Sequence, residues 1–259
     1  MTKPFNWKLF FILLAASLFG TLAIIPYATG LTAGVGQPQA ITWQLVALGL
    51  IQAAILNSLV VAIGLWCANR TGLGLPILEA ALRGEAVGER VRAMLPLSIG
   101  LGAVAGLLII GLEAAVFQPA MLAEYGDPAE AFAAAARQPA WKAFLASFYG
   151  GINEELLLRL FLMSLLAWLG RFISRTADGG PTMAVLWIAN IVSAVLFGLG
   201  HLPTTATIVP LTPLIVTRAL VLNGIGGLIF GWLYMKRGLE SAMLSHFSAD
   251  IVLHVIFGI

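Results

Sequence analysis

The sequence predicts an all-α protein, a polytopic transmembrane helix bundle of about seven spans. Of its 259 residues, 60% are hydrophobic and only 10% are charged, whereas a soluble domain carries about 25% charged residues. The mean hydropathy is +0.96. Apolar runs of about 20 residues, the length that crosses a bilayer as a helix, recur along the chain. We treat residues 1–259 as a single integral-membrane domain, to which one or two short interfacial helices could be added.

Seven apolar runs define the expected spans. Tryptophans lie near most of their ends, where an indole ring favours the membrane interface. The first run is longer than the roughly 7–15 residues of a signal-peptide core, so we interpret it as an uncleaved span, with cleavage near 27–30 as the alternative. A short interfacial helix is expected around Ile77–Val91, and a second one, capped by Asp127, is expected after the third span. The expected limits of the spans are 9–28, 42–68, 94–117, 141–169, 183–202, 213–235 and 240–258.

The basic residues predict the orientation of the spans. Arg137 and Lys142 fall on the side opposite the N-terminus, and Arg159 and Arg218 fall within spans. This bias predicts an N-terminus inside, and we expect the plasma membrane of a bacterium or archaeon. No basic cluster suggests nucleic acid, and the single cysteine, Cys67, rules out an intramolecular disulfide. The other basic residues share the N-terminal side: Lys3, Lys8, Arg70, Arg83, Arg90, Arg92, Arg171, Arg175, Lys236 and Arg237.

Three charged residues lie inside the fourth span, where a charge is costly unless it is paired. Glu155 and Arg159 are four residues apart, so in a helix they share a face and can neutralise each other. Glu154 is rotated from that face by about 100°. Its neighbour four residues on is Leu158, which carries no charge. Glu154 therefore needs a polar partner from another helix.

Histidines in two later spans are the candidate partners of Glu154. His201 closes the fifth span, and His246 lies in the seventh. Asp250 and His254 continue the His246 stripe at four-residue spacing, so Asp250 could orient or charge either histidine. His254, near the chain end, is expected at the membrane interface. Glu113 and Arg218, near span ends, are expected to reach the interface as well.

An acid and two histidines within a membrane support three chemistries. Glu154 could act as general base on a water that His201 holds, with His246 and Asp250 stabilising the oxyanion or the leaving group. Two histidines and a glutamate also match a hydrolytic zinc site. Proton relays of transporters use the same residue types. The sequence contains neither His-Glu-x-x-His nor Gly-x-Ser-x-Gly, so the common zinc-protease and serine-hydrolase patterns do not apply.

Each feature also has a purely structural interpretation. Glu155 and Arg159 could be a buried clamp without catalytic work, and His201 could be a solvated helix end. The small residues from Asn223 to Gly231 in the sixth span are interpreted as close helix packing rather than a hinge. It is the combination of the polar residues in an otherwise apolar bundle that favours a site.

Three motifs together resemble the CAAX prenyl protease and bacteriocin-processing family, also called the abortive-infection family of intramembrane proteases. Its Glu-Glu-x-x-x-Arg pattern is read here over 154–159, Phe-x-x-x-His over 197–201, and a relative of His-x-x-x-Asn over 246–250. The resemblance covers about 141–258, and the first three spans match only as generic spans. Two departures stand out. Leu158-Arg159-Leu160 replaces the aromatic-Arg-Gly of many members, and Asp250 replaces the more frequent asparagine.

The resemblance implies an intramembrane endopeptidase acting on a membrane-associated protein or peptide, which could carry a lipid. Glu154 would be the catalytic acid and base, His201 would hold the water, and His246 with Asp250 would assist. Supporting roles would fall to Glu155, Arg159 and Phe197. No cofactor is favoured, and zinc held by Glu154, His201 and His246 is the alternative.

Two other functions compete with the protease, namely a non-catalytic membrane binding or immunity protein on the same fold and a proton-coupled transporter. Nothing in the sequence selects a substrate or an oligomeric state. The topology also sets a condition, because His201 is expected at the outer end of its span and His246 near the inner start of its own. A shared site requires a bend in 202–213, a deeper start of the seventh helix, or a short, tilted fifth helix.

Overall fold

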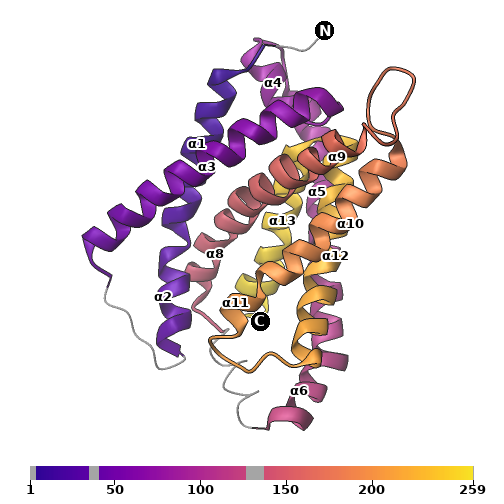
Figure 1. The fold of residues 1–259 in the computed structure, drawn as a ribbon. Coiled ribbons are helices and arrows are strands. Elements are labelled where there is room, and N and C mark those ends of the chain that lie inside the picture. Colours follow the sequence, from indigo (N-terminus) through magenta and orange to yellow (C-terminus); the bar gives the residue numbers. More distant parts are fainter. Residues whose placement is uncertain (1–3, 35–40, 127–136, 259) are drawn as a thin grey trace.

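The computed structural model describes residues 4–34, 41–126 and 137–258, and within these ranges it is an all-helical bundle without strands (Figure 1). The predicted fold class is therefore confirmed. An isolated bridge between Arg175 and Pro181 closes the turn of a connecting loop. The helices form seven rods, each at the place of one predicted apolar run.

The first four rods agree with the expected limits to within a few residues, except that the first and third rods are longer. The first combines α1 (Trp7–Ala23) and α2 (Ile25–Gly34), and the second is α3 (Trp43–Thr71). The third runs through α5 (Gly88–Leu112), the π-helical η1 (Glu113–Phe117) and α6 (Gln118–Tyr125). The fourth runs through α8 (Ala140–Phe148), the π-helical η2 (Tyr149–Glu154) and η3 (Leu156–Met163), and α9 (Ser164–Gly170).

The last three rods carry the second and third motifs. The fifth is α10 (Met183–Gly200), followed by the short α11 (Leu202–Thr205), and the sixth is α12 (Pro213–Arg237). The seventh is α13 (Leu239–Asp250), continued by the π-helical η4 (Ile251–Ile256). Among the described residues, five helices are long and apolar enough to cross a membrane, and they belong to rods one, two, three, five and six. Rods four and seven carry the charged and histidine motifs, which lower their hydropathy.

The expected interfacial helix at 77–91 is only partly correct. A helix does form, as α4 (Pro76–Leu82), but it ends before residue 91. Gly84 adopts φ +81°, a left-handed conformation that glycine tolerates and that ends a helix. The remaining residues, from Gly88, begin α5, so the third rod starts six residues earlier than expected. The helix expected after Asp127 lies outside the described residues.

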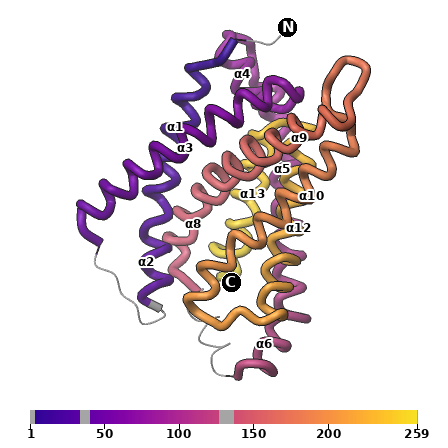
Figure 2. Tube along the Cα trace, viewed as in Figure 1, coloured from indigo at the N-terminus to yellow at the C-terminus, as the bar shows by residue number. Residues whose placement is uncertain are grey.

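The seventh rod occupies the middle of the bundle. Its helix α13 packs against α5, α12, α8 and η2, and Figure 2 shows its yellow trace between these segments. Close approach depends on glycine: a Cβ at Gly102 of α5 would lie 3.0 Å from the carbonyl carbon of Ser245 and closer still to its oxygen. At one flank α3 packs on α1, η3 and α9, and little of it is buried in the bundle.

Candidate active site

The first motif lies on a stretch of π-helix. Residues 149–163 follow π geometry except at Glu155, within one rod that runs from α8 to α9. π-Helical turns are rare and are frequent at functional sites. Gly150 lies in this stretch, directly against the third motif, since a Cβ there would collide with the Asp250 carboxylate and lie 3.2 Å from His246 Nε2. The glycine therefore allows the two motif-bearing rods to approach closely.

Glu155 and Arg159 form the predicted clamp. Glu155 Oε1 lies 2.8 Å from Arg159 Nη1, and the side chains are 0% and 1% exposed. The second guanidinium nitrogen, Nη2, donates a 3.0 Å hydrogen bond to the carbonyl of Gly227 on α12. The guanidinium also lies 5.3 Å and 5.4 Å from the ring centres of Phe197 and Phe230. The clamp thus joins the fourth, fifth and sixth rods.

Glu155 does more than the sequence predicted. Its Oε1, which pairs with Arg159, also accepts a 2.8 Å hydrogen bond from His246 Nδ1. A carboxylate accepts only, so Nδ1 must carry the proton in this contact. Glu155 therefore fixes both the ring plane of His246 and the position of its proton. Helical spacing within one rod could not predict this contact, because it depends on how α13 is placed against η2.

The other edge of the His246 ring faces two more acids. His246 Nε2 lies 3.6 Å from Glu154 Oε2 and 3.7 Å from Asp250 Oδ1. Both distances exceed those of good direct hydrogen bonds and are compatible with a bridging water. Phe230 stacks on the ring, with centroids 4.6 Å apart and planes inclined by 19°. Phe230 could not be predicted as a site residue from the sequence, because an aromatic residue in an apolar span carries no distinguishing signal.

His201 follows directly after α10, and its ring turns back along that helix. Its Nδ1 is 2.9 Å from the carbonyl oxygen of Phe197. A carbonyl can only accept, so this bond places the proton on Nδ1 and leaves Nε2 of the neutral ring as an acceptor. The Phe197 ring lies between the two histidines, 4.9 Å from that of His201 and 5.7 Å from that of His246.

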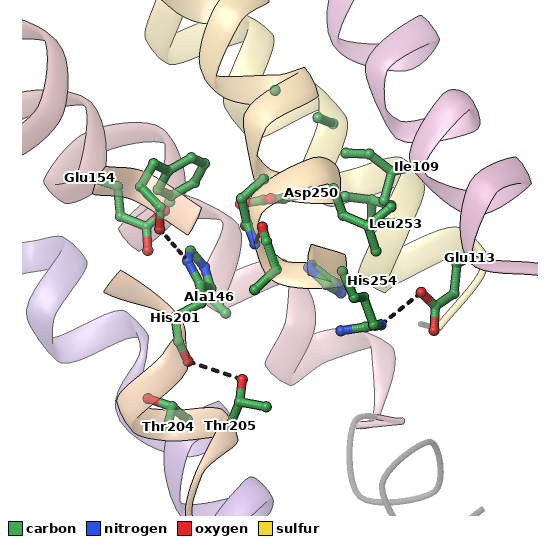
Figure 3. Close-up of a pocket in the computed structure, with 18 of the residues that line it drawn as sticks. Ile109, Glu113, Ala146, Glu154, His201, Thr204, Thr205, Asp250, Leu253 and His254 are labelled. Atoms are coloured by element: carbon green, nitrogen blue, oxygen red, sulfur yellow. Dashed lines mark hydrogen bonds and ion pairs between the residues drawn. The ribbon is translucent and has the colours of Figure 1, made fainter. Parts of the chain in front are cut away.

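Glu154, His201, His246 and Asp250 line one cavity of about 660 Å³. Figure 3 shows Glu154 and His201 on one side and Asp250 on the other. His201 and His246 line the same cavity, so the condition set by the sequence is met. The His201 ring turns back toward Phe197, and the seventh rod begins at Leu239, one residue before its expected start. Tyr149 and Asn223 also line the cavity and were not singled out as site residues.

Three residues that were expected at the interface also line this cavity. Arg218 Nε lies 2.8 Å from Glu113 Oε2, and the two side chains are 21% and 16% exposed. His254 lines the cavity as well, with its ring centroid 6.2 Å from that of Tyr27. Figure 3 draws Glu113 on the side of the cavity opposite Glu154. These three residues form a polar wall of the cavity, which their positions near span ends did not predict.

The zinc alternative requires three ligands that converge on one point. Among the described residues, no three His, Cys, Asp or Glu side chains are grouped to hold a metal ion. In the expected set, Nδ1 of His201 and Nδ1 of His246 are each engaged in a hydrogen bond. Histidines that bind a metal through Nε2 commonly make such Nδ1 hydrogen bonds, so these two contacts do not separate the zinc alternative from the metal-free one.

A helix bundle with apolar spans and a cavity lined by acids and histidines defines an integral membrane protein with an internal polar site. Residues 136–252 match the family model described as Type II CAAX prenyl endopeptidase Rce1-like. The resemblance to the CAAX protease family drawn from the three motifs is therefore confirmed over this part of the chain. At the level of the family, the match supports a CAAX-type intramembrane protease. Comparisons with curated proteins and with solved structures gave no match.

Proposed function

We propose that the protein is an intramembrane endopeptidase that hydrolyses a peptide bond of a membrane-associated protein or peptide. The observation that carries this proposal is the single cavity lined by Glu154, His201, His246 and Asp250. Each group has a different set of neighbours, which suits it to a different step. The family match over residues 136–252 supports the same class of reaction.

Glu154 and His201 are suited to hold the attacking water. The Glu154 side chain is 25% exposed, unlike that of Glu155, so it can meet a water in the cavity. Nε2 of His201 is an acceptor, because Nδ1 is engaged with Phe197. A water that donates one hydrogen to each group turns an oxygen lone pair toward a substrate carbonyl. Glu154 then takes the proton as the C–O bond forms.

His246 and Asp250 are suited to the tetrahedral intermediate. Nδ1 of His246 is committed to Glu155, so its Nε2 is the edge that faces the reacting carbonyl. With a proton on Nε2, the ring donates to the developing oxyanion, and Asp250 at 3.7 Å balances its charge. Glu154 returns the proton to the leaving amine as the C–N bond breaks. The acid–base cycle then closes without a covalent intermediate.

The walls of the cavity suggest what the substrate brings. Most of them are apolar, and they come from rods that face lipid elsewhere. We propose that the substrate is a membrane-associated segment, which could carry a lipid, and that membrane lipid is the protein's other partner. Apolar residues that line the cavity include Ile24, Leu31, Ile109, Met121, Leu222 and Leu253.

Incubation of the purified protein with a membrane-peptide library tests the proposal. Glu154→Gln, which keeps the shape but cannot take a proton, is expected to lower cleavage by at least about 10²-fold, the range of general acid–base catalysis. His201→Ala should lower it comparably. Glu124→Gln, an exposed change on α6, is the matched control and should leave cleavage intact. Cleavage that survives both site changes would remove this assignment.

Two further outcomes separate the alternatives. A wild-type protein that binds library peptides but cleaves none would favour a binding or immunity protein. A chelator titration addresses the zinc alternative: loss of activity that zinc restores would overturn the metal-free mechanism, and activity that persists would support it.

A further inference from the structure

The proposed mechanism leaves one half of the oxyanion site without a clear donor. Asp250 stands where the family pattern has an asparagine, and an ionised carboxylate accepts hydrogen bonds but donates none. His246 can supply one donor, from Nε2. Sites that stabilise a tetrahedral oxyanion commonly aim more than one preorganised donor at it. A second donor would be a neutral side chain on the cavity wall near the histidines.

Asn223 on α12 is such a group. The cavity-lining residues of this helix share one face, and Asn223 is the amide among them. Its side chain is half-buried, so it is accessible from the cavity. Gln118, the other amide among the described lining residues, belongs to α6, the last helix of the third rod. The α12 face consists of Arg218, Ala219, Leu222, Asn223, Gly226 and Phe230.

Close contacts between α10 and α12 fix the depth of Asn223. An added Cβ at Gly198 would lie 2.9 Å from the carbonyl oxygen of Ala219, and one at Gly227 would lie 2.7 Å from the Ala194 Cβ. Asn223 is midway between Ala219 and Gly227, so it lies level with the stretch of α10 between Ala194 and Gly198. The neighbouring α13 runs antiparallel to α12. From the level of His246, which Phe230 contacts, Asn223 and Asp250 therefore lie in the same direction.

The amide is already oriented by its own helix. Nδ2 donates one hydrogen to the carbonyl of Ala219, at 2.9 Å. The two N–H bonds of a planar amide diverge, so the second one points away from that carbonyl. An Asn side chain that bonds to the carbonyl four residues earlier is also an ordinary feature of helices, and the experiment below distinguishes the two roles.

We propose that the Asn223 amide donates the second hydrogen bond to the tetrahedral oxyanion, taking the part that Asp250 cannot take as a carboxylate. This inference rests on the proposed protease function. It predicts that an amide at position 250 and the amide at position 223 are partly redundant. The pair can therefore be tested by transferring the amide between the two helices.

Asn223→Asp, nearly isosteric but unable to donate when ionised, and Asn223→Ala are measured against a cleavable membrane peptide. Loss of one oxyanion donor lowers kcat by about 10²–10³-fold, and we expect that loss with KM changed by less than about threefold. In an Asp250→Asn background, the effect of Asn223→Ala on kcat should shrink to about tenfold or less. A phosphinate peptide, whose tetrahedral anion mimics the intermediate, should lose affinity for Asn223→Ala in step with kcat/KM.

Other outcomes overturn the inference. A change in kcat below threefold, or an equal loss of kcat in both backgrounds, would show that Asn223 serves only as a hydrogen-bond donor within its own helix. A loss that appears in KM instead of kcat has the same meaning. Thermal unfolding of each variant identifies a loss of activity caused by misfolding. The Asp250→Asn background separates the two causes as well, because an amide at position 250 would restore the oxyanion donor but would not correct misfolding. Failure of the protease function itself looks different, since the wild type would then cleave nothing or Glu154→Gln would still cleave.

Discussion

Two adjacent glutamates, Glu155 and Glu154, lie at opposite edges of the His246 imidazole ring. Glu155 accepts from His246 Nδ1 at 2.8 Å, and Glu154 lies 3.6 Å from Nε2. Burial separates their roles, because the Glu155 side chain is 0% exposed while that of Glu154 is 25% exposed to the cavity. A carboxylate without access to water, such as that of Glu155, is suited to position the imidazole. A carboxylate beside the cavity, such as that of Glu154, is suited to react.

Removing the charge of Glu155 tests this division. Glu155→Gln leaves the Arg159 guanidinium buried without its counterion, which costs about 3–5 kcal/mol of stability. The paired change Glu155→Leu with Arg159→Met removes both charges and is expected to recover most of that loss. It should not recover cleavage, because His246 still lacks its Nδ1 partner. Unfolding in mixed micelles and cleavage rates measure the two effects. If stability and cleavage both recovered in the double variant, Glu155 would serve only as the counterion of Arg159.

At this scale the sequence predicts contacts within a helix better than contacts between helices. Four-residue spacing was enough to pair Glu155 with Arg159 and to leave Glu154 in need of a partner. The Glu155–His246 bond was not predictable, since it depends on the depth and rotation of α13. Phe230 and Asn223 were missed as site residues for a related reason, as neither lies in a charged motif and only the fold brings them to the cavity.

Between paired helices, glycines set the distance between rods. Gly227 allows α12 to contact α10, and its carbonyl also receives Arg159 Nη2. The small residues of this stretch predicted close packing, and the contacts at Gly227 agree with that prediction. They also show that glycines of one stretch differ, because a Cβ at Gly224 would meet nothing within 4 Å.

Alanine at these two positions should have opposite effects. Gly227→Ala places a methyl group 2.7 Å from the Ala194 Cβ and 2.9 Å from its Cα, and such overpacking costs about 1–3 kcal/mol. Gly224→Ala, the matched control on the same helix, points into open space and should be neutral or stabilising by up to about 1 kcal/mol, as expected from helix propensity. Unfolding measurements on both variants decide. Equal destabilisation would contradict the packing drawn here.

Gly150 allows a second test of close packing, here between the fourth and seventh rods. A Cβ at this position would collide with the Asp250 carboxylate and press on His246 Nε2, so Gly150→Ala should displace both from Glu154. A misplacement of about 1 Å can cost about 10²-fold in rate, and we expect a loss of that order with the fold retained. Gly100→Ala, whose Cβ would meet nothing within 4 Å, serves as the control. Unchanged cleavage by Gly150→Ala would show that the two rods need not approach so closely.

For the whole molecule, the apolar runs predicted all seven rods within the described ranges, because burial in lipid demands long, apolar helices. The same signal is uniform along each rod, so it carries no information on tilt, depth or neighbours. The relative depth of His201 and His246 therefore could not be predicted from the sequence. The π-helical turns of the fourth rod could not be predicted either, since helix propensities do not distinguish a π-helix from an α-helix.

The orientation of the bundle is the remaining prediction at this scale. Basic residues predict that the loop after α9 lies inside and that the segment after α11 lies outside. These loops lie at opposite ends of the bundle (Figure 1). In a Cys67→Ser background, Thr207→Cys should react with a membrane-impermeant maleimide on intact cells. Asp178→Cys should react only after permeabilisation. Thr204 and Thr205 line the cavity beside Thr207, so this result would place the nearby cavity wall toward the outer side. The reverse labelling pattern would invert the topology and move that wall to the inner side.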